Sequence, residues 1–471
     1  MKRRLEHLSK EKFSLIKRLK EVSPIRLIVF SFLAIIIVGT ILLIFPFSSR
    51  SQQFTPPLDA LFTATSATCV TGLAVYDTWT HWSDLGQGII LSLIQLGGLG
   101  LVTFTTGFTL LLRRKLGLRD MQLAKEYTNG SVMDTPRLLR TILLFTFAFE
   151  TIGALLLAIR FVPQFGSYGI WLSIFTSVSA YCNAGFDIMG FTTPYVGLTG
   201  YVHDPLVSLT VSALIALGGL GFLVYSDIYL WLQKKRKGIE KHPHLTVHSS
   251  VVLRTTLALI VIGTVLFLFL EYNHSLAGMN IFQKIHASLF QSVSARTAGF
   301  STINVADQYD STKLMTIVLM FIGASPASTG GGIKTTTFVV LISTIISVLR
   351  GRDETMIMKR RVDKSIVYRA LTIAILALLL ICITSGIMMV VEPDGLSAVD
   401  VLFEAVSAFG TVGLSAGITP DLGALSKIML SFTMFVGRVG PISLILALSA
   451  HQGNGRNSQE TVAPDARIVV G

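Results

Sequence analysis

A short pattern that occurs four times along the chain constrains the fold more than any other feature. The pattern is Phe, three residues, Ser-Ala, a short variable stretch and Gly, and its copies begin at Phe62, Phe175, Phe290 and Phe403. These phenylalanines are 113, 115 and 113 residues apart. The closing glycines are 113, 114 and 114 residues apart, at Gly72, Gly185, Gly299 and Gly413. One copy alone would carry little weight, but four copies at nearly constant spacing predict a chain built from four related units.

The segments around each copy are apolar enough to enter a membrane. Of the 471 residues, 51% are apolar and 14% are charged, against about 25% charged in soluble domains. Residues 27–47 and 88–112 form charge-free runs of 21 and 25 residues, and about 20 helical residues span a bilayer core. The first run is too long for a signal peptide and no small-residue cleavage site follows it. We therefore expect it to remain attached as a transmembrane helix.

The net charge of +12 is concentrated in alternate loops. Basic residues gather in 2–20, 113–119, 234–237 and 350–361, while the intervening loops carry few. This positive-inside pattern predicts a multi-pass protein of the cell membrane whose termini and basic loops lie in the cytoplasm. The basic loops are then expected to contact membrane lipid or a cytosolic partner, and nucleic acid is not expected. Three cysteines, Cys69, Cys182 and Cys382, offer neither a disulfide framework nor metal-ligand spacing.

Each copy of the pattern lies between two long apolar segments. The outer segments are expected at 27–47, 141–159, 251–270 and 370–391, and the inner ones at 88–112, 206–225, 314–348 and 428–450. Since both ends of each pair face the cytoplasm, the short segment between them must enter the membrane from outside and return. We predict an all-α membrane protein with eight transmembrane helices and four re-entrant pore helices around a pseudo-fourfold pore. The expected repeats are 24–125, 126–245, 246–360 and 361–451, between a basic N-terminus (1–23) and a C-terminal tail (452–471).

Four re-entrant segments around one axis predict an ion filter. Irregular backbone at membrane depth is tolerated only where protein or a water-filled cavity satisfies its polar groups. A glycine permits positive φ and close approach to the axis, so that neighbouring carbonyl oxygens can replace the water around an ion. The alternative is that the glycines only allow close helix packing in a transporter bundle. The predicted filter residues are Val70, Thr71, Gly72, Asn183, Ala184, Gly185, Thr297, Ala298, Gly299, Thr411, Val412 and Gly413.

The third inner segment is too long for one straight crossing. Its 35 residues would reach roughly 52 Å as a helix, beyond a core of about 30 Å. Pro326 and three consecutive glycines predict a break within 323–337. We expect this stretch to face the cavity below the filter as a gate, with a simple kink as the alternative. The predicted gate residues are Gly323, Ala324, Ser325, Pro326, Ser328, Thr329, Gly330, Gly331, Gly332 and Lys334.

Arg438 is predicted to join this gate. It lies near mid-membrane, where an arginine costs about 2.5 to 3.5 kcal/mol unless it faces protein or water. It is expected to point toward the loop as a barrier to cations, or, alternatively, to pin helices together. Glu404 is interpreted either as an attractor of cations at the outer mouth or as a packing residue. Gly97 and Gly218 are expected to allow close helix packing.

Enzymatic chemistry is not expected. The stretch at Gly323 lacks the spacing of a phosphate-binding loop before Lys334, and no strand precedes it, so we predict that this chain binds no nucleotide. No catalytic constellation is visible, which makes a membrane-embedded enzyme remote. An alternating-access secondary cation transporter is the alternative function. It would be expected to carry inverted repeats, whereas the four repeats here share one orientation.

The filter segments resemble those of the Trk/Ktr/HKT superfamily of potassium transporters, in particular KtrB-type membrane subunits. The matching stretches are SATCVTGLA, SAYCNAGF, SARTAGF and SAFGTVGLSAG, and the likeness extends from about residue 25 onward. The resemblance implies potassium (K+) uptake, sodium (Na+) dependence, an intramembrane gating loop and an arginine that faces it. It also implies a homodimer above a cytosolic KtrA-like regulatory ring that binds ATP or ADP.

Overall fold

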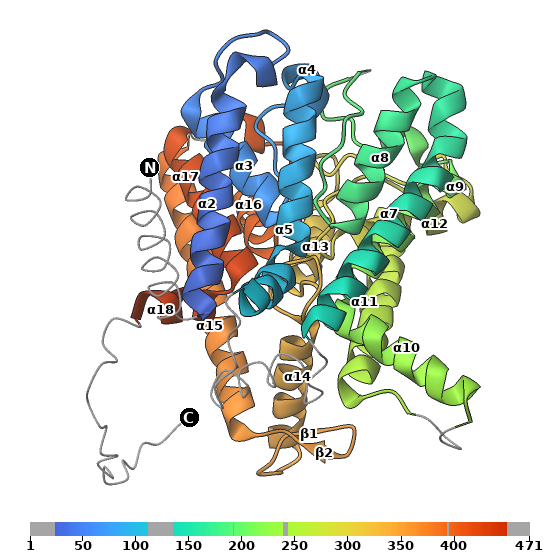
Figure 1. The fold of residues 1–471 in the computed structure, drawn as a ribbon, viewed down its shortest axis with the longest axis vertical. Helices are drawn as coiled ribbons and strands as arrows, with labels where there is room; N and C mark the ends of the chain where they lie inside the picture. Colours follow the sequence, from blue (N-terminus) through green and yellow to red (C-terminus); the bar gives the residue numbers. More distant parts are fainter. Residues whose placement is uncertain (1–23, 112–134, 192, 239–243, 393–394, 450–471) are drawn as a thin grey trace, which may run out of the picture.

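The computed structural model describes residues 24–111, 135–191, 193–238, 244–392 and 395–449, and this part of the chain is mostly helical. Figure 1 shows the helices as an upright array. The strands of the described part form one small antiparallel hairpin, β1 (Met356–Ile357) and β2 (Arg360–Arg361), which lies beyond the lower ends of the helices. The basic N-terminus, the basic loop at 113–119 and the C-terminal tail lie outside the described residues.

Each repeat begins with a long outer helix. The four outer helices are α2 (Pro24–Ile44), α7 (Thr135–Phe165), α11 (Val247–Glu271) and α15 (Lys364–Val391). Each packs against a short helix of its own repeat, which ends where the predicted filter begins. The short helices are α3 (Pro57–Cys69), α8 (Tyr168–Tyr181), α12 (Ile281–Ser294) and α16 (Ala398–Gly410). Among the described residues, these four outer helices are the single helices that are long and apolar enough to cross a membrane.

The inner helices differ from one repeat to the next. The first is α5 (Asp84–Leu111), which runs without a break. The others are divided into α9 (Pro205–Leu220) and α10 (Phe222–Arg236), α13 (Asp310–Phe321) and α14 (Thr335–Leu349), and α17 (Ala424–Val439) and α18 (Pro441–Ser449). The expected break in the third inner helix is therefore present, between α13 and α14.

The inner segments expected at 206–225 and 428–450 are not single straight helices. The structure bends the second by 91° and the fourth by 93°. Gly221 and Gly440 occupy the bends with φ of +92° and +91°, a conformation that glycine adopts without the steric penalty of a Cβ. If each bent pair counts as one span, up to six of the described helices and pairs are apolar enough to cross a membrane.

Side-chain caps determine where several helices begin. Asp204 accepts hydrogen bonds from the backbone N–H groups of Leu206 and Val207 at the start of α9. Asn280 and Gln283 form a reciprocal capping box at the start of α12. These caps satisfy backbone donors that the first helical turn leaves without partners. The remaining short elements are η1 (Pro46–Ser48), α4 (Thr78–His81), η2 (Thr199–Tyr201) and η3 (Thr419–Asp421).

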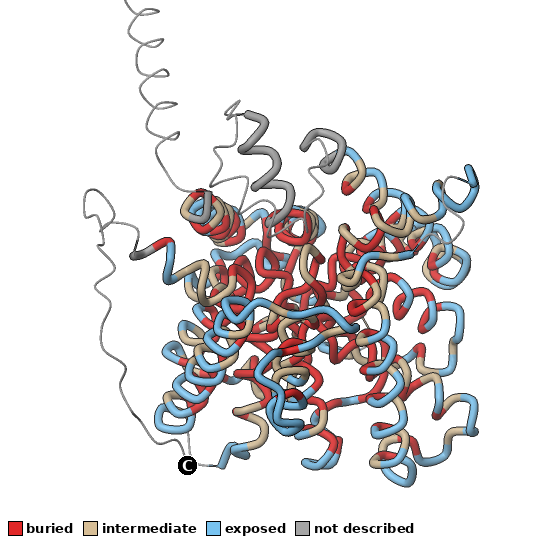
Figure 2. Tube along the Cα trace, turned by 90° about the horizontal axis from the view of Figure 1, so that it is seen from below, coloured by how far each residue is buried: buried red, intermediate tan, exposed pale blue. Residues whose placement is uncertain are grey.

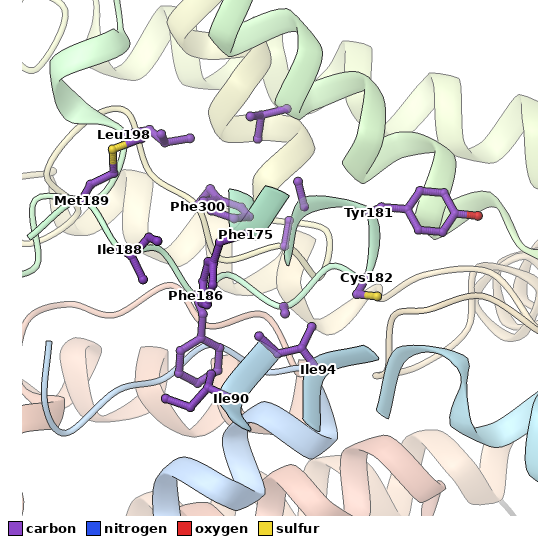
Figure 3. Packing of buried hydrophobic residues seen from close by; sticks show 14 of the residues in the cluster. Ile90, Ile94, Phe175, Tyr181, Cys182, Phe186, Ile188, Met189, Leu198 and Phe300 are labelled. Atoms are coloured by element: carbon purple, nitrogen blue, oxygen red, sulfur yellow. The ribbon is translucent and has the colours of Figure 1, made fainter. Parts of the chain in front are cut away.

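The core lies at the centre of the helix array, and apolar side chains also cover its outside. Figure 2 shows buried residues gathered in the middle and exposed ones around the periphery. The four repeated phenylalanines are at most 1% exposed. In Figure 3 one buried cluster combines Ile90 and Ile94 of α5 with Phe175 of α8 and with Phe186 and Phe300, which follow two of the filter glycines. In each outer helix, only 28–33% of the most apolar stretch of 18 residues is buried inside the protein. The exposed remainder suits contact with lipid.

Candidate ion filter and gate

The four short helices end in the same unusual backbone conformation. The residue two positions before each filter glycine has positive φ: 58° at Val70, 59° at Asn183, 74° at Thr297 and 49° at Thr411. The glycines themselves have φ of 98°, 72°, 78° and 89°. Valine and threonine rarely adopt this region because their branched side chains crowd the backbone. Such strain persists only where the surroundings impose it, and it is typical of functional segments.

The repeated serine of the sequence pattern holds this conformation. Its backbone carbonyl accepts a hydrogen bond from the N–H that precedes the glycine, at 2.8 to 3.0 Å. Its hydroxyl group contacts the backbone at or just after the glycine. The four serines are Ser66, Ser179, Ser294 and Ser407. A packing role alone would not require a hydroxyl group here, so the hydrogen bonds explain why the pattern contains serine.

The four segments form a closed ring. A Cβ added to any of the filter glycines would collide with the carbonyl oxygen that precedes the glycine of another segment. Gly72 meets Ala184, Gly185 meets Ala298, Gly299 meets Val412 and Gly413 meets Thr71. This order returns to its starting point, so main-chain atoms of all four segments surround one axis. The predicted filter residues are thus brought together, as sequence spacing led us to expect.

Glycines in three inner helices allow these helices to pack closely against the ends of the short helices that precede the ring. A Cβ at Gly97, Gly218 or Gly437 would collide with a carbonyl oxygen of the neighbouring short helix. In each case that oxygen belongs to the residue four positions before the filter glycine. The close packing expected at Gly97 and Gly218 is therefore present, and its partner is the end of the re-entrant helix.

The loop between α13 and α14 lies directly against three filter segments. Thr329 Oγ1 donates to the carbonyl of Tyr181 at 3.2 Å and lies 3.1 Å from Asn183 Oδ1. The N–H of Gly331 donates to Thr411 Oγ1 at 3.0 Å. A Cβ at Gly330 would collide with Thr297 Oγ1. The predicted gate residues therefore lie next to the filter, and a larger side chain at these glycines would not fit.

The loop is also held by the inner helices on either side. The N–H of Ser325 donates to the carbonyl of Gly219 at 3.1 Å, and that of Gly332 to Gly437 at 3.3 Å. Lys334 extends its ammonium group to the carbonyl of Gly330, at 2.7 Å. These contacts satisfy backbone groups of a segment that is not helical, as its place inside the protein requires.

Arg438 joins the loop to the first inner helix. Its side chain is 3% exposed, and it donates hydrogen bonds to the carbonyls of Thr329, Gly97 and Gly98. The distance to Gly97 is 2.5 Å. The arginine thus faces the loop and connects it to α5 through carbonyls, whereas its role as a barrier to cations stays a prediction.

Glu404 does not lie at an open mouth. It is fully buried, and its carboxylate accepts hydrogen bonds from Ser415 Oγ at 2.5 Å, Ala416 N at 3.1 Å and Thr419 Oγ1 at 2.9 Å. All three donors belong to the chain that leaves the fourth filter segment. The packing interpretation is the one that these contacts support.

Two ion pairs between repeats were missed from the sequence. Lys313 of α13 contacts Asp400 of α16 at 2.8 Å, and Lys427 of α17 contacts Asp59 of α3 at 2.8 Å. Each lysine is the fourth residue of its inner helix, and each aspartate stands three residues before a repeated phenylalanine. Aligning the repeats would have revealed this coincidence. Within the described residues no cluster of three or more His, Cys, Asp or Glu side chains suits a metal ion.

Comparison with known proteins identifies the family. The sequence profile of TrkH, described as a cation transport protein, matches residues 14–459. The chain belongs to the TrkH family. This confirms the resemblance to the Trk/Ktr/HKT superfamily and makes the chain a multi-pass membrane transporter of cations rather than an enzyme.

Two relatives and one solved structure agree with this assignment. The chain is 37% identical over 460 residues to the Ktr system potassium uptake protein B of Bacillus subtilis, covering 95% of this chain and 97% of that protein. It is 37% identical over 434 residues to the potassium/sodium uptake protein NtpJ of Enterococcus hirae, covering 91% and 93%. The fold is similar to the potassium transporter TrkH from Vibrio parahaemolyticus, with a TM-score of 0.68 at 16% identity over 91% and 86% of the two chains.

Proposed function

We propose that this chain takes up potassium across the cytoplasmic membrane through the ring of four filter segments. The observation that carries the proposal is the closed order of the glycines, each against a carbonyl oxygen of another segment. The names of the two relatives, a potassium uptake protein and a potassium/sodium uptake protein, support the choice of ion. Carbonyl oxygens of the filter residues replace the water shell of the ion as it enters.

The short helices favour a cation in the ring. Each ends immediately before its filter segment, so its carbonyl end, which carries the negative end of the helix dipole, lies at the ring. The segment after the glycine then leads away from the ring and is braced in the fourth repeat by Glu404. Rigid bracing keeps the oxygens at distances that suit one size of ion.

The loop at 322–334 acts as the gate in this proposal. It contacts the second, third and fourth filter segments, so an ion leaving the ring meets it first. Arg438 is buried beside the loop and the part-buried Lys334 stands at the end of it, and both pair with carbonyls, which leaves positive charge on the ion's path. Conduction requires the loop to move aside and take Lys334 with it.

The finer organisation is part of the same proposal. We assign the chain eight crossings, the four repeats as divided above and cytosolic termini, on the strength of the positive-inside pattern. The likeness to the Ktr system protein supports the further proposal of sodium dependence, a homodimer and a KtrA-like cytosolic ring that binds ATP or ADP. The hairpin β1–β2 and the basic end of α10, with Lys234, Lys235 and Arg236, are suitable contacts for that ring.

The alternative is an alternating-access secondary transporter. Such proteins usually contain inverted repeats around a site at mid-membrane. The four short helices here each follow an outer helix and precede an inner one in the same order. This order favours the pore.

Rubidium uptake into proteoliposomes tests the proposal. Gly72→Ser and Gly299→Ser would force a side chain into the ring, so we expect a loss of uptake or of the preference for rubidium over sodium. Gly386→Ser is the matched control, because a Cβ there meets nothing within 4 Å. Shortening the loop by Gly330 to Gly332 is expected to raise uptake several-fold. Unchanged ion preference in both filter variants would refute the pore, and unchanged uptake after shortening would refute the gate.

A further inference from the structure

A small cavity behind the third filter segment contains a cation without a partner. Arg296, three residues before Gly299, is 7% exposed and lines the cavity together with Thr256 of α11 and residues of α9. The side chain of Arg296 forms no hydrogen bond or ion pair with any described residue, and its Nε is fully enclosed. Thr256 Oγ1, on the same cavity, also lacks a partner. Buried polar groups in native proteins almost always have partners.

The second repeat has an equivalent place with the opposite charge. Cys182 stands three residues before Gly185, as Arg296 stands before Gly299. Its sulfur lies 3.8 Å from Glu150 Oε1 and 3.7 Å from Gln95 Oε1. The second repeat thus places a buried carboxylate behind its filter segment.

Hydrogen bonds establish which residues correspond. Ser177 donates to the carbonyl of Glu150 at 2.7 Å, and Ser292 donates to that of Ile260 at 2.8 Å. Each serine stands two residues after its repeated phenylalanine, so Ile260 takes the place of Glu150. Ile260 lines the cavity of Arg296. The third repeat therefore has an apolar residue where a carboxylate would neutralise its arginine.

No carboxylate is among the residues that line the cavity. Among the described residues Arg438 contacts only carbonyls, and so does the ammonium group of Lys334. Ala324 of the gate loop also lines the cavity. The lining of the cavity therefore offers no negative charge to balance Arg296. A water molecule would satisfy the hydrogen bonds of Arg296 but would leave its charge unbalanced.

We propose that this cavity binds one small monovalent anion of the halide class, with chloride as the physiological ion. Arg296 and the hydroxyl group of Thr256 donate hydrogen bonds to it. The cavity has room for a ligand of about the size of one water molecule. A chloride ion is only slightly larger than a water molecule, whereas phosphate or an organic carboxylate is much larger. The anion offsets a guanidinium group one residue from Thr297 of the filter, and so lowers the repulsion that a cation meets in the ring.

Bromide tests the site directly. Crystals of the full chain grown or soaked in bromide are expected to show an anomalous peak between Arg296 and Thr256. Ile260→Glu places a carboxylate where the second repeat has Glu150, and the peak should disappear, while Ile260→Leu, the apolar control, should retain it. A wild-type crystal in bromide without a peak at Arg296 would overturn the proposal.

The effect on transport rests on the proposed function and has its own test. Rubidium uptake by the wild type and by Ile260→Leu is expected to fall several-fold when gluconate replaces chloride. Ile260→Glu should show the same uptake in both media because its carboxylate replaces the anion. Equal wild-type uptake in both media would refute the effect on transport, whatever the bromide result. If bromide binds but the filter variants leave ion preference unchanged, the pore fails and the anion site stands.

Discussion

Single residues in this structure are fixed by more than one constraint. At Gly72 both the φ of 98° and a carbonyl oxygen 2.5 Å from the position of a Cβ exclude any other residue. At Glu404 the constraint is chemical, because three donors converge on one buried carboxylate. In the third repeat Gln291 stands at the same place after the repeated phenylalanine and donates to Ser301, at 2.9 Å. In the third and fourth repeats, a long polar side chain therefore hydrogen-bonds to the chain that follows the filter glycine.

Glu404→Gln is expected to loosen the fourth filter segment. The amide keeps the size of the side chain but removes its charge and replaces one acceptor oxygen with a donor, so at least one of the three hydrogen bonds must reverse its direction or be lost. We expect a loss of about 1–3 kcal/mol of stability and a weaker preference for rubidium over sodium. Thermal unfolding in detergent and competition uptake in proteoliposomes measure the two effects. Glu354→Gln in the exposed hairpin region is the control, and identical selectivity in both variants would contradict the bracing role.

Sequence reasoning reached some of these residues and missed others for physical reasons. The ring residues were predictable because a fixed spacing repeats the same local backbone four times. The approach of Arg438 to the loop was predictable because a charge at membrane depth needs polar surroundings. The unpartnered state of Arg296 was not predictable, since it depends on which residues of α9 and α11 pack around it. The partners of Glu404 depend in the same way on the path of the chain at 415–419.

Bends in the inner helices connect neighbouring helices to the loop between α13 and α14. At Gly221 the chain turns between α9 and α10, and the N–H of Phe222 donates to the carbonyl of Ala327 in the loop at 2.8 Å. The sequence did not reveal this bend, because one glycine within an apolar run is also compatible with a straight helix. The orientation of α10 is therefore coupled to the position of the loop.

Gly221→Ala is expected to disturb both the bend and the loop. Its φ of +92° is unfavourable for alanine, and a Cβ would lie 2.5 Å from the carbonyl oxygen of Pro326. We expect lower thermal stability and higher basal rubidium uptake, because the loop must move away. Gly238→Ala is the matched control: its φ is +62° but nothing lies within 4 Å of its Cβ. If both variants behave alike, the bend does not control the loop.

The four repeats are joined at their seams by different chemistry. Ion pairs connect the third repeat to the fourth and the fourth to the first. Trp171 of the second repeat donates to Gln87 Oε1 of the first at 3.0 Å. At the corresponding place in α9 the hydroxyl group of Ser208 has no partner among the described residues. At this position, among the described residues, the seam between the second and third repeats lacks the polar side-chain contact that the other three have, and Arg296 lies at the same seam.

The ion pair between Lys313 and Asp400 offers a test of how these seams hold the ring. The two side chains are 6% and 18% exposed, so removal of one partner leaves a mostly buried charge. Lys313→Met alone is expected to cost about 3–5 kcal/mol, whereas Lys313→Met with Asp400→Leu should recover most of that loss, because an apolar pair of similar volume replaces a buried ion pair at little net cost. Thermal unfolding of the two single variants and the double variant measures the coupling.

Rubidium selectivity, measured alongside, is expected to fall in the single variants and to return in the double variant if the seam fixes the ring through packing. If selectivity stays low in the stable double variant, the charges themselves position the filter and apolar packing at this seam is not sufficient.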